Sequence, residues 1–191
     1  MARVELLELT DSNDEELLTL AEHFLTADGS VPNHFRAEAH FPEVLKHVFR
    51  ARIALWESGP LPQHLMKKVA VAVSMANGCQ YCTGAFCSML DSDDSAYRFQ
   101  QRIIDDQLGE FEEAVIDFAL KVNENEHAVT DEDFQSLREG FDLSDRGFVQ
   151  LVYCVNIISG YNRVTTVFDV EYDHSYPTEV LDETVETSTD K

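Results

Sequence analysis

The strongest constraint on the fold is a helical spacing of apolar residues that recurs along most of the chain. In residues 11–27 the apolar side chains follow this spacing. Asp11 or Ser12 suits the cap of this helix, and acidic residues follow in its first turn. Residues 31–41 and 41–56 place Pro32 and Pro42 where a first helical turn tolerates proline. The first part of the chain therefore predicts three helices.

The middle of the chain predicts a buried helix. Gly59-Pro60 and Pro62 break the chain before residues 63–77, which are apolar on nearly all sides after Lys68. The valines of this segment also suit a buried strand, but its length and helical surroundings favour a helix.

Helical spacing continues beyond the cysteines, over residues 93–106 and 110–124. Thr130 and Asp133 form a capping-box pattern, and Gly140 is a natural stop for the helix that they begin. Ser144 opens the last and longest helix, which is apolar enough to cross the core. We therefore predict an all-α fold.

The length and the end of the chain indicate one domain with a tail. A chain of 191 residues, of which 44% are hydrophobic, is the size of a single domain with a real core. The helical pattern fills residues 1–170, whereas residues 171–191 are acidic and short of apolar side chains, as solvated or flexible tails are. A partner-wrapping arm is the alternative for this tail.

Charge excludes two classes of partner. With 36 acidic and 14 basic residues, the net charge of -22 repels nucleic acid and anionic lipid. Such a balance is typical of salt-adapted cells, where salt screens self-repulsion, although an ordinary acidic cytosolic protein is the alternative. The first residues lack a signal-peptide pattern, and the apolar runs are shorter than a bilayer span. We therefore predict a soluble cytoplasmic protein that does not associate with a membrane.

The segment NGCQYCTGAFC carries the most chemistry, because Cys79 and Cys82 form a Cys-x-x-Cys pair after Asn77-Gly78. If a helix starts at Cys79, both thiols lie in its first turn on one face, where they can form a disulfide. The positive end of a helix favours thiolate over thiol. In a reducing compartment this pair favours redox chemistry over metal binding or packing.

A zinc site is the metal alternative, and it needs further ligands beyond the pair. Cys87 and Cys154 form no second Cys-x-x-Cys, and both suit packing better, Cys154 because it lies in a strongly apolar stretch. We therefore predict no metal and no cofactor.

The cysteine segment, the apolar helix before it and residues 117–164 after it resemble the AhpD-like alkylhydroperoxidases of the carboxymuconolactone decarboxylase superfamily. The resemblance covers roughly residues 30–168, and its most specific element is S-x-A-N-G-C-x-Y-C. It implies an all-helical domain built around a central antiparallel helix pair, and a homo-oligomer, often a trimer or hexamer.

The resemblance also implies a thiol peroxidase. Cys82 is then the peroxidatic cysteine, which forms a sulfenic acid, and Cys79 resolves it to a redox-active disulfide. The partners would be a hydroperoxide and a thiol or dithiol reductant. The family's proton relay, a Glu twelve residues before the first cysteine and a His four after the second, is replaced here by Lys67 and Phe86.

Two residues are candidates for part of the missing relay. Lys67 can favour the thiolate by its charge, and His64, on the same broad face of the helix, can carry a proton, although an exposed polar role suits it as well. Phe86 suits the core, and Tyr81 is either a pocket wall or simply buried. For four other residues we expect satisfied, solvated or packing roles: His34, His40, Asn162 and Arg163.

Three hypotheses follow for the function. The first is a thiol-dependent redox enzyme that reduces hydroperoxides or exchanges disulfides through Cys79 and Cys82. The second is a catalytically weak relative that serves as an oligomeric binding protein or redox sensor. The third, a lyase of the carboxymuconolactone decarboxylase type, is disfavoured because that branch does not depend on a Cys-x-x-Cys pair.

Overall fold

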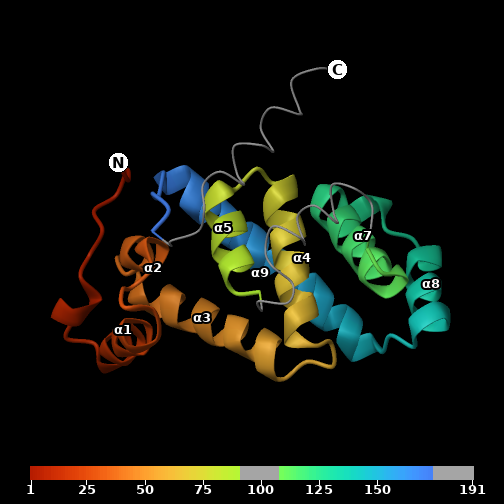
Figure 1. Ribbon diagram of the computed structural model, residues 1–191, viewed down its shortest axis with the longest axis horizontal. Helices are drawn as coiled ribbons and strands as arrows, with labels where there is room; N and C mark the ends of the chain where they lie inside the picture. Colours follow the sequence, from red (N-terminus) through yellow and green to blue (C-terminus); the bar gives the residue numbers. More distant parts are fainter. Residues whose placement is uncertain (91–107, 174–191) are drawn as a thin grey trace, which may run out of the picture.

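The computed structural model describes residues 1–90 and 108–173, and within these ranges it contains helices and no strand (Figure 1). The predicted all-α fold is confirmed. The helix predicted over residues 93–106 and the tail beyond residue 173 lie outside the described residues. The elements in chain order are η1 (Leu9–Asp11), α1 (Glu15–Asp28), α2 (Asn33–Glu38), α3 (Pro42–Glu57), α4 (Gln63–Ala76), α5 (Gln80–Ser88), α7 (Glu110–Glu124), η2 (Glu126–Ala128), α8 (Asp131–Phe141) and α9 (Asp145–Phe168).

Helix α1 begins later than the sequence predicts. Its cap is Asp14, whose carboxylate accepts the backbone N–H groups of Glu16 and Leu17, so the prediction of Asp11 or Ser12 is wrong. The Ser12 hydroxyl instead accepts the N–H of Asp14. Both short polar side chains satisfy backbone donors here, and only the three-dimensional turn decides which one caps the helix.

Two other helix ends also differ from the prediction. Helix α8 starts with the expected capping box of Thr130 and Asp133, but it continues past Gly140 and ends where Asp142 adopts a left-handed backbone with φ of 54°. Pro32 lies at the cap of α2 rather than in its first turn. Pro42 occupies the first turn of α3 as predicted.

Helices α4 and α5 form a hairpin at the centre of the molecule, and α9 crosses behind them (Figure 1). The connection is short because Gly78 adopts φ of 65°, which a residue with a side chain rarely takes. Helix α4 is buried on nearly all sides over residues 65–74, so it forms the centre of the larger core. Among the described residues, no helix combines the length and apolarity of a membrane span.

A second, smaller core lies under the N-terminal helices α1 to α3, at the opposite end of the molecule from α7 and α8 (Figure 1). Phe24 and Phe35 pack in it with their ring centroids 4.8 Å apart. Helix α2 also contacts α9, and α3 contacts both α4 and α9. The N-terminal helices therefore pack against the central helices α4 and α9 through α2 and α3.

Candidate active site

The connection between α4 and α5 fixes the position of the two cysteines through a network of side-chain amides, of which Asn162 is buried. The Asn77 side chain donates to Asn162 Oδ1 at 2.8 Å, and its own oxygen accepts from Asn123 Nδ2 at 2.8 Å. Asn162 in turn donates to Ser74 Oγ at 3.0 Å. This network ties the hairpin to α7 and α9, and it shows that Asn162 packs as predicted, whereas Arg163 is exposed.

Cys79 is the N-terminal cap of α5, whose first helical residue is Gln80, one position after the start considered from the sequence. Its sulfur accepts the backbone N–H of Cys82 at 3.4 Å, and the two cysteines lie 3.3 Å apart. Both thiols are free and buried, so the structure shows the reduced pair and no disulfide. The reduced thiols are in position for disulfide formation after a small movement.

Thr165 of α9 contacts the sulfurs of both Cys79 and Cys82. Its Oγ1 lies 3.2 Å from Cys79 Sγ, 3.6 Å from Cys82 Sγ and 2.9 Å from the carbonyl oxygen of Tyr161, which is an alternative acceptor for its single proton. A hydroxyl can rotate its proton, so Thr165 can donate to a sulfur that has lost its own. The sequence gives no local signal for this contact, because Thr165 lies on a different helix.

The surroundings place the negative charge of the pair on Cys79. The pKa of Cys79 is lowered to about 6, first by the hydrogen bond from the Cys82 thiol, and then by Thr165 and the Cys82 N–H. The pKa of Cys82 is raised, because its proton is held by Cys79 and because burial disfavours the thiolate. The resting pair therefore holds one proton on Cys82 and a thiolate on Cys79.

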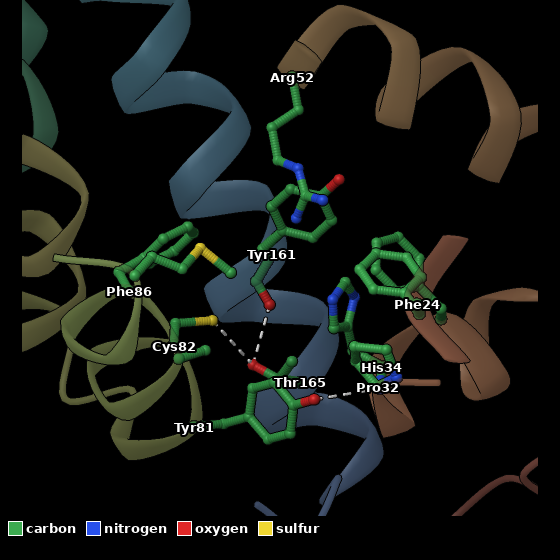
Figure 2. Close-up of a pocket in the computed structure, with 12 residues that line it drawn as sticks. Phe24, Pro32, His34, Arg52, Tyr81, Cys82, Phe86, Tyr161 and Thr165 are labelled. Carbon is green, nitrogen blue, oxygen red and sulfur yellow. Dashed lines mark hydrogen bonds between the residues drawn. The ribbon is translucent and has the colours of Figure 1, made fainter. Parts of the chain in front are cut away.

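Cys82 is the cysteine that faces a cavity. The cavity measures about 30 Å³ and lies between α5, α9 and the N-terminal helices (Figure 2). A cavity needs roughly 10–15 Å³ to hold one water molecule, so a group of a few atoms fits here without movement of the walls. The lining residues are Phe24, Pro32, His34, Phe35, Arg52, Tyr81, Cys82, Ala85, Phe86, Met89, Tyr161 and Thr165.

His34 enters this cavity from α2, and sequence reasoning did not assign it a role there. Its Nδ1 lies 2.7 Å from Glu38 Oε1, and both side chains are largely buried. Its Nε2 has no hydrogen-bond partner among the described residues, so it is free to face a ligand. The spacing of four residues between His34 and Glu38 was the signal in the sequence, since it places them on one face of a helix.

Arg52 reaches the same cavity from α3. It is only 7% exposed, and its guanidinium carbon lies 5.3 Å, 5.0 Å and 5.7 Å from the ring centroids of Phe35, Phe49 and Tyr161. Its Nε has no hydrogen-bond partner in the part of the chain that the structure describes. Nothing in the sequence marks Arg52, because it lies inside an ordinary amphipathic helix.

The other residues singled out in the sequence occupy varied places. Lys67 donates to the carbonyl of Met89 at 3.0 Å, and His64 is exposed on the first turn of α4, so neither lines the cavity. The catalytic roles predicted for both stay predictions. His40 is exposed and lies 3.0 Å from the carbonyl of Glu5.

Phe86 is buried as predicted, and it also lines the cavity. Tyr81 is both buried and a cavity wall, and its hydroxyl donates to Asp173 at 2.8 Å. Cys87 and Cys154 are buried in the main core, and burial raises the pKa of Cys154 to about 12. Within residues 1–90 and 108–173, no three His, Cys, Asp or Glu side chains gather as a metal site would require.

Comparison with known proteins finds one family model that matches the segment with the cysteine pair. Residues 42–90, which span α3 to α5, match the model of the carboxymuconolactone decarboxylase family. No protein with a curated description matches the sequence significantly.

Several solved structures share the fold. The alkylhydroperoxidase AhpD core of an uncharacterized peroxidase-related protein from Ralstonia eutropha JMP134 is 25% identical, with a TM-score of 0.81 over 90% of this chain and 92% of that one. An uncharacterized peroxidase-related protein from Silicibacter sp. TM1040 is 21% identical, with a TM-score of 0.80 over 92% and 93% of the two chains. The debrominase Bmp8, as a cysteine-to-alanine variant in complex with 2,3,4-tribromopyrrole, is 20% identical, with a TM-score of 0.73 over 94% and 96%.

The family match covers the helices that carry the cysteine pair, and the structural likeness covers nearly the whole chain. The chain is therefore similar to the carboxymuconolactone decarboxylase family over residues 42–90, and it has the fold of an AhpD-like peroxidase-related protein.

Proposed function

We propose that this protein is a thiol peroxidase that reduces organic hydroperoxides through Cys82 and Cys79. The observation that carries the proposal is the arrangement of the pair: Cys82 lines a small cavity, and Cys79, which forms no disulfide, lies 3.3 Å from it. A hydroperoxide group matches the cavity because only a few atoms fit. The fold shared with peroxidase-related proteins supports the same chemistry.

In the first step the Cys82 sulfur attacks the outer oxygen of the peroxide as its proton passes to the Cys79 thiolate. The O–O bond breaks, Cys82 becomes a sulfenic acid, and the departing oxygen takes a proton to leave as an alcohol. In the second step the Cys79 sulfur attacks the Cys82 sulfur, which releases water and forms the disulfide. An external dithiol then reduces this disulfide by exchange and is itself oxidised.

The proton for the departing oxygen comes from His34 in this mechanism. The family's usual Glu and His positions hold Lys67 and Phe86, and Phe86 has no proton to give. His34 lines the same cavity as Cys82, and Glu38 holds its Nδ1 so that Nε2 faces the ligand. The His34–Glu38 pair thus supplies the same two residue types from a different helix.

The test is hydroperoxide-dependent oxidation of a dithiol reductant, measured for the wild type and for Cys79→Ser and Cys82→Ser, in low and high salt. We expect turnover by the wild type and none by either variant. A wild-type rate equal to that of both variants and of the enzyme-free control contradicts the proposal. Cys87→Ser is the matched control, because that thiol is buried away from the cavity.

Reductive removal of a halogen is a second candidate, because a protein of the same fold is a debrominase. The same thiol pair can supply its two electrons: Cys82 takes the halogen from carbon, Cys79 displaces it as halide to form the disulfide, and the carbon takes a proton. The aromatic walls suit a halogenated ring, but the cavity holds only a few atoms unless those walls move. Halide release from a brominated aromatic, measured beside peroxide consumption, distinguishes the two reactions.

We infer that the chain acts as a homo-oligomer. Val149 and Tyr153 of α9 are 56% and 58% exposed, and they border an apolar groove between α9 and α3. Light scattering on the purified protein tests this, and a monomer at micromolar concentration contradicts it.

A further inference from the structure

The Cys82 cavity contains hydrogen-bond donors that no group of the described residues satisfies. Within residues 1–90 and 108–173, Arg52 Nε and the Tyr161 hydroxyl are both buried without a hydrogen-bond partner, and both side chains line the cavity. Arg52 is 7% exposed and Tyr161 is 4% exposed. Leaving such a group unpaired costs free energy, so two in one wall call for an explanation.

The unpaired guanidinium is notable in a chain with 36 acidic residues against 14 basic ones. Arg52 makes no ion pair with a described residue, although a neighbouring arginine on the same helix, Arg50, pairs with Glu16. Glu38, which lies near Tyr161, is bonded to His34. The positive charge of Arg52 is stabilised instead by the faces of three aromatic rings, and its Nε–H has no acceptor among the described residues.

Tyr161 adds a second donor beside Arg52. Burial raises the pKa of Tyr161 to about 12, so its hydroxyl keeps its proton and can donate. The Arg52 guanidinium lies over the Tyr161 ring, with Cys82 and His34 on the two sides of this stack (Figure 2). The cavity wall formed by this stack therefore offers a positive charge and two donors; no Asp or Glu is among the described residues that line the cavity, and the nearby Glu38 carboxylate is bonded to His34.

We propose that Arg52 and Tyr161 bind an anionic carboxylate group of the substrate, so that the preferred substrates are small hydroperoxides that carry a carboxylate. That the substrate is a hydroperoxide rests on the proposed function. That it carries a carboxylate rests on the residues of the cavity alone. A guanidinium and a carboxylate form charge-assisted hydrogen bonds, which strengthen where water is excluded. The size of the cavity restricts the ligand to a short chain.

The test compares two small reagents that alkylate thiols and differ in charge. Iodoacetate carries a carboxylate, and iodoacetamide is its neutral equivalent of nearly the same size. The rate at which each modifies Cys82 is measured by peptide mass spectrometry, and the ratio of the two rates cancels changes in the reactivity of the sulfur. Neither reagent needs a peroxide, so the result is independent of whether the protein is a peroxidase.

We expect Arg52→Met to lower the ratio of iodoacetate to iodoacetamide rates about tenfold, because one charge-assisted hydrogen bond is worth at least that factor. Arg52→Lys, which keeps the charge, retains part of the preference, and Tyr161→Phe loses a smaller part. Arg50→Met is the matched control, since it removes the same charge from the exposed face of the same helix and leaves the ratio unchanged.

An unchanged ratio in Arg52→Met overturns the carboxylate site, and so does an equal fall in Arg50→Met, which would reflect net charge alone. Thermal unfolding of each variant checks that it is folded. Hydroperoxide turnover is measured in parallel on the wild type. If turnover is present and the ratio does not move, the peroxidase proposal stands and only the carboxylate site is lost.

Discussion

Thr165→Val tests how the cysteine pair holds its negative charge. Valine has nearly the shape of threonine but cannot donate a hydrogen bond, so the thiolate of Cys79 loses the donor that lies 3.2 Å away. A hydrogen bond to a charged group contributes about 1.5 kcal/mol or more, which is roughly tenfold in the ionisation constant. Thr165→Val therefore raises the pKa of Cys79 above its value of about 6.

The measurement is the ultraviolet absorbance of the thiolate as a function of pH, with the spectrum of Cys79→Ser subtracted. Loss of a proton creates the thiolate, so the signal is present above the pKa and disappears below it. At pH 6 we expect about fivefold less thiolate in Thr165→Val than in the wild type, and equal amounts at about pH 9.

Thr166→Val gives a graded comparison, because Thr166 is the weakest of the groups that lower the pKa of Cys79. We expect its midpoint to move less than that of Thr165→Val. A wild-type midpoint in the ordinary thiol range near 8.5, or no change in Thr165→Val, refutes the reasoning about the pair.

Three further predictions concern proton transfer, the core and salt. His34→Gln lowers the rate of hydroperoxide reduction by about 10²-fold. It leaves alkylation of Cys82 by iodoacetamide unchanged, because iodide leaves without a proton, and the control His40→Gln changes neither rate. An equal loss of rate in both reactions of His34→Gln would contradict a proton-transfer role. Gln150→Leu lowers the free energy of unfolding by about 2–4 kcal/mol in urea titration, because its side chain bonds the backbone of Leu55 and Leu61; a loss below about 0.5 kcal/mol would contradict this. The melting temperature rises from low salt to about 1 M salt as the charge of -22 is screened, and a fall would contradict self-repulsion.

Local patterns predicted most of the fold. The capping box at Thr130 and the cap at Ser144 depend on residues close in sequence, and both are confirmed. Helix α5 begins one residue after Cys79, which is its cap. The ends that differ involve competing short polar residues. Asp14 rather than Ser12 caps α1, because either side chain can satisfy the same kind of donor.

The site could be predicted only in part, because most of it comes from distant helices. Cys79 and Cys82 stand out by their spacing, but Arg52, Tyr161 and Thr165 face them from α3 and α9, and no sequence pattern joins those helices to α5. The family resemblance drew attention to Lys67, whose ammonium donates to the carbonyl of Met89 at the C-terminal end of α5; its predicted role stays a prediction. The His34–Glu38 pair is the one part of the site that a search for helical spacing could have found.

The central claim is that Cys82 takes the oxygen of a hydroperoxide and Cys79 then closes the disulfide. Its most direct test treats reduced protein with one equivalent of an alkyl hydroperoxide and maps the cysteines by mass spectrometry, in the presence of a reagent that traps sulfenic acids. We predict a Cys79–Cys82 disulfide in the wild type and a trapped sulfenic acid on Cys82 in Cys79→Ser. Unmodified thiols at both positions in the wild type would contradict this claim. So would the reverse assignment, in which Cys82→Ser gives a sulfenic acid on Cys79 and Cys79→Ser gives none on Cys82.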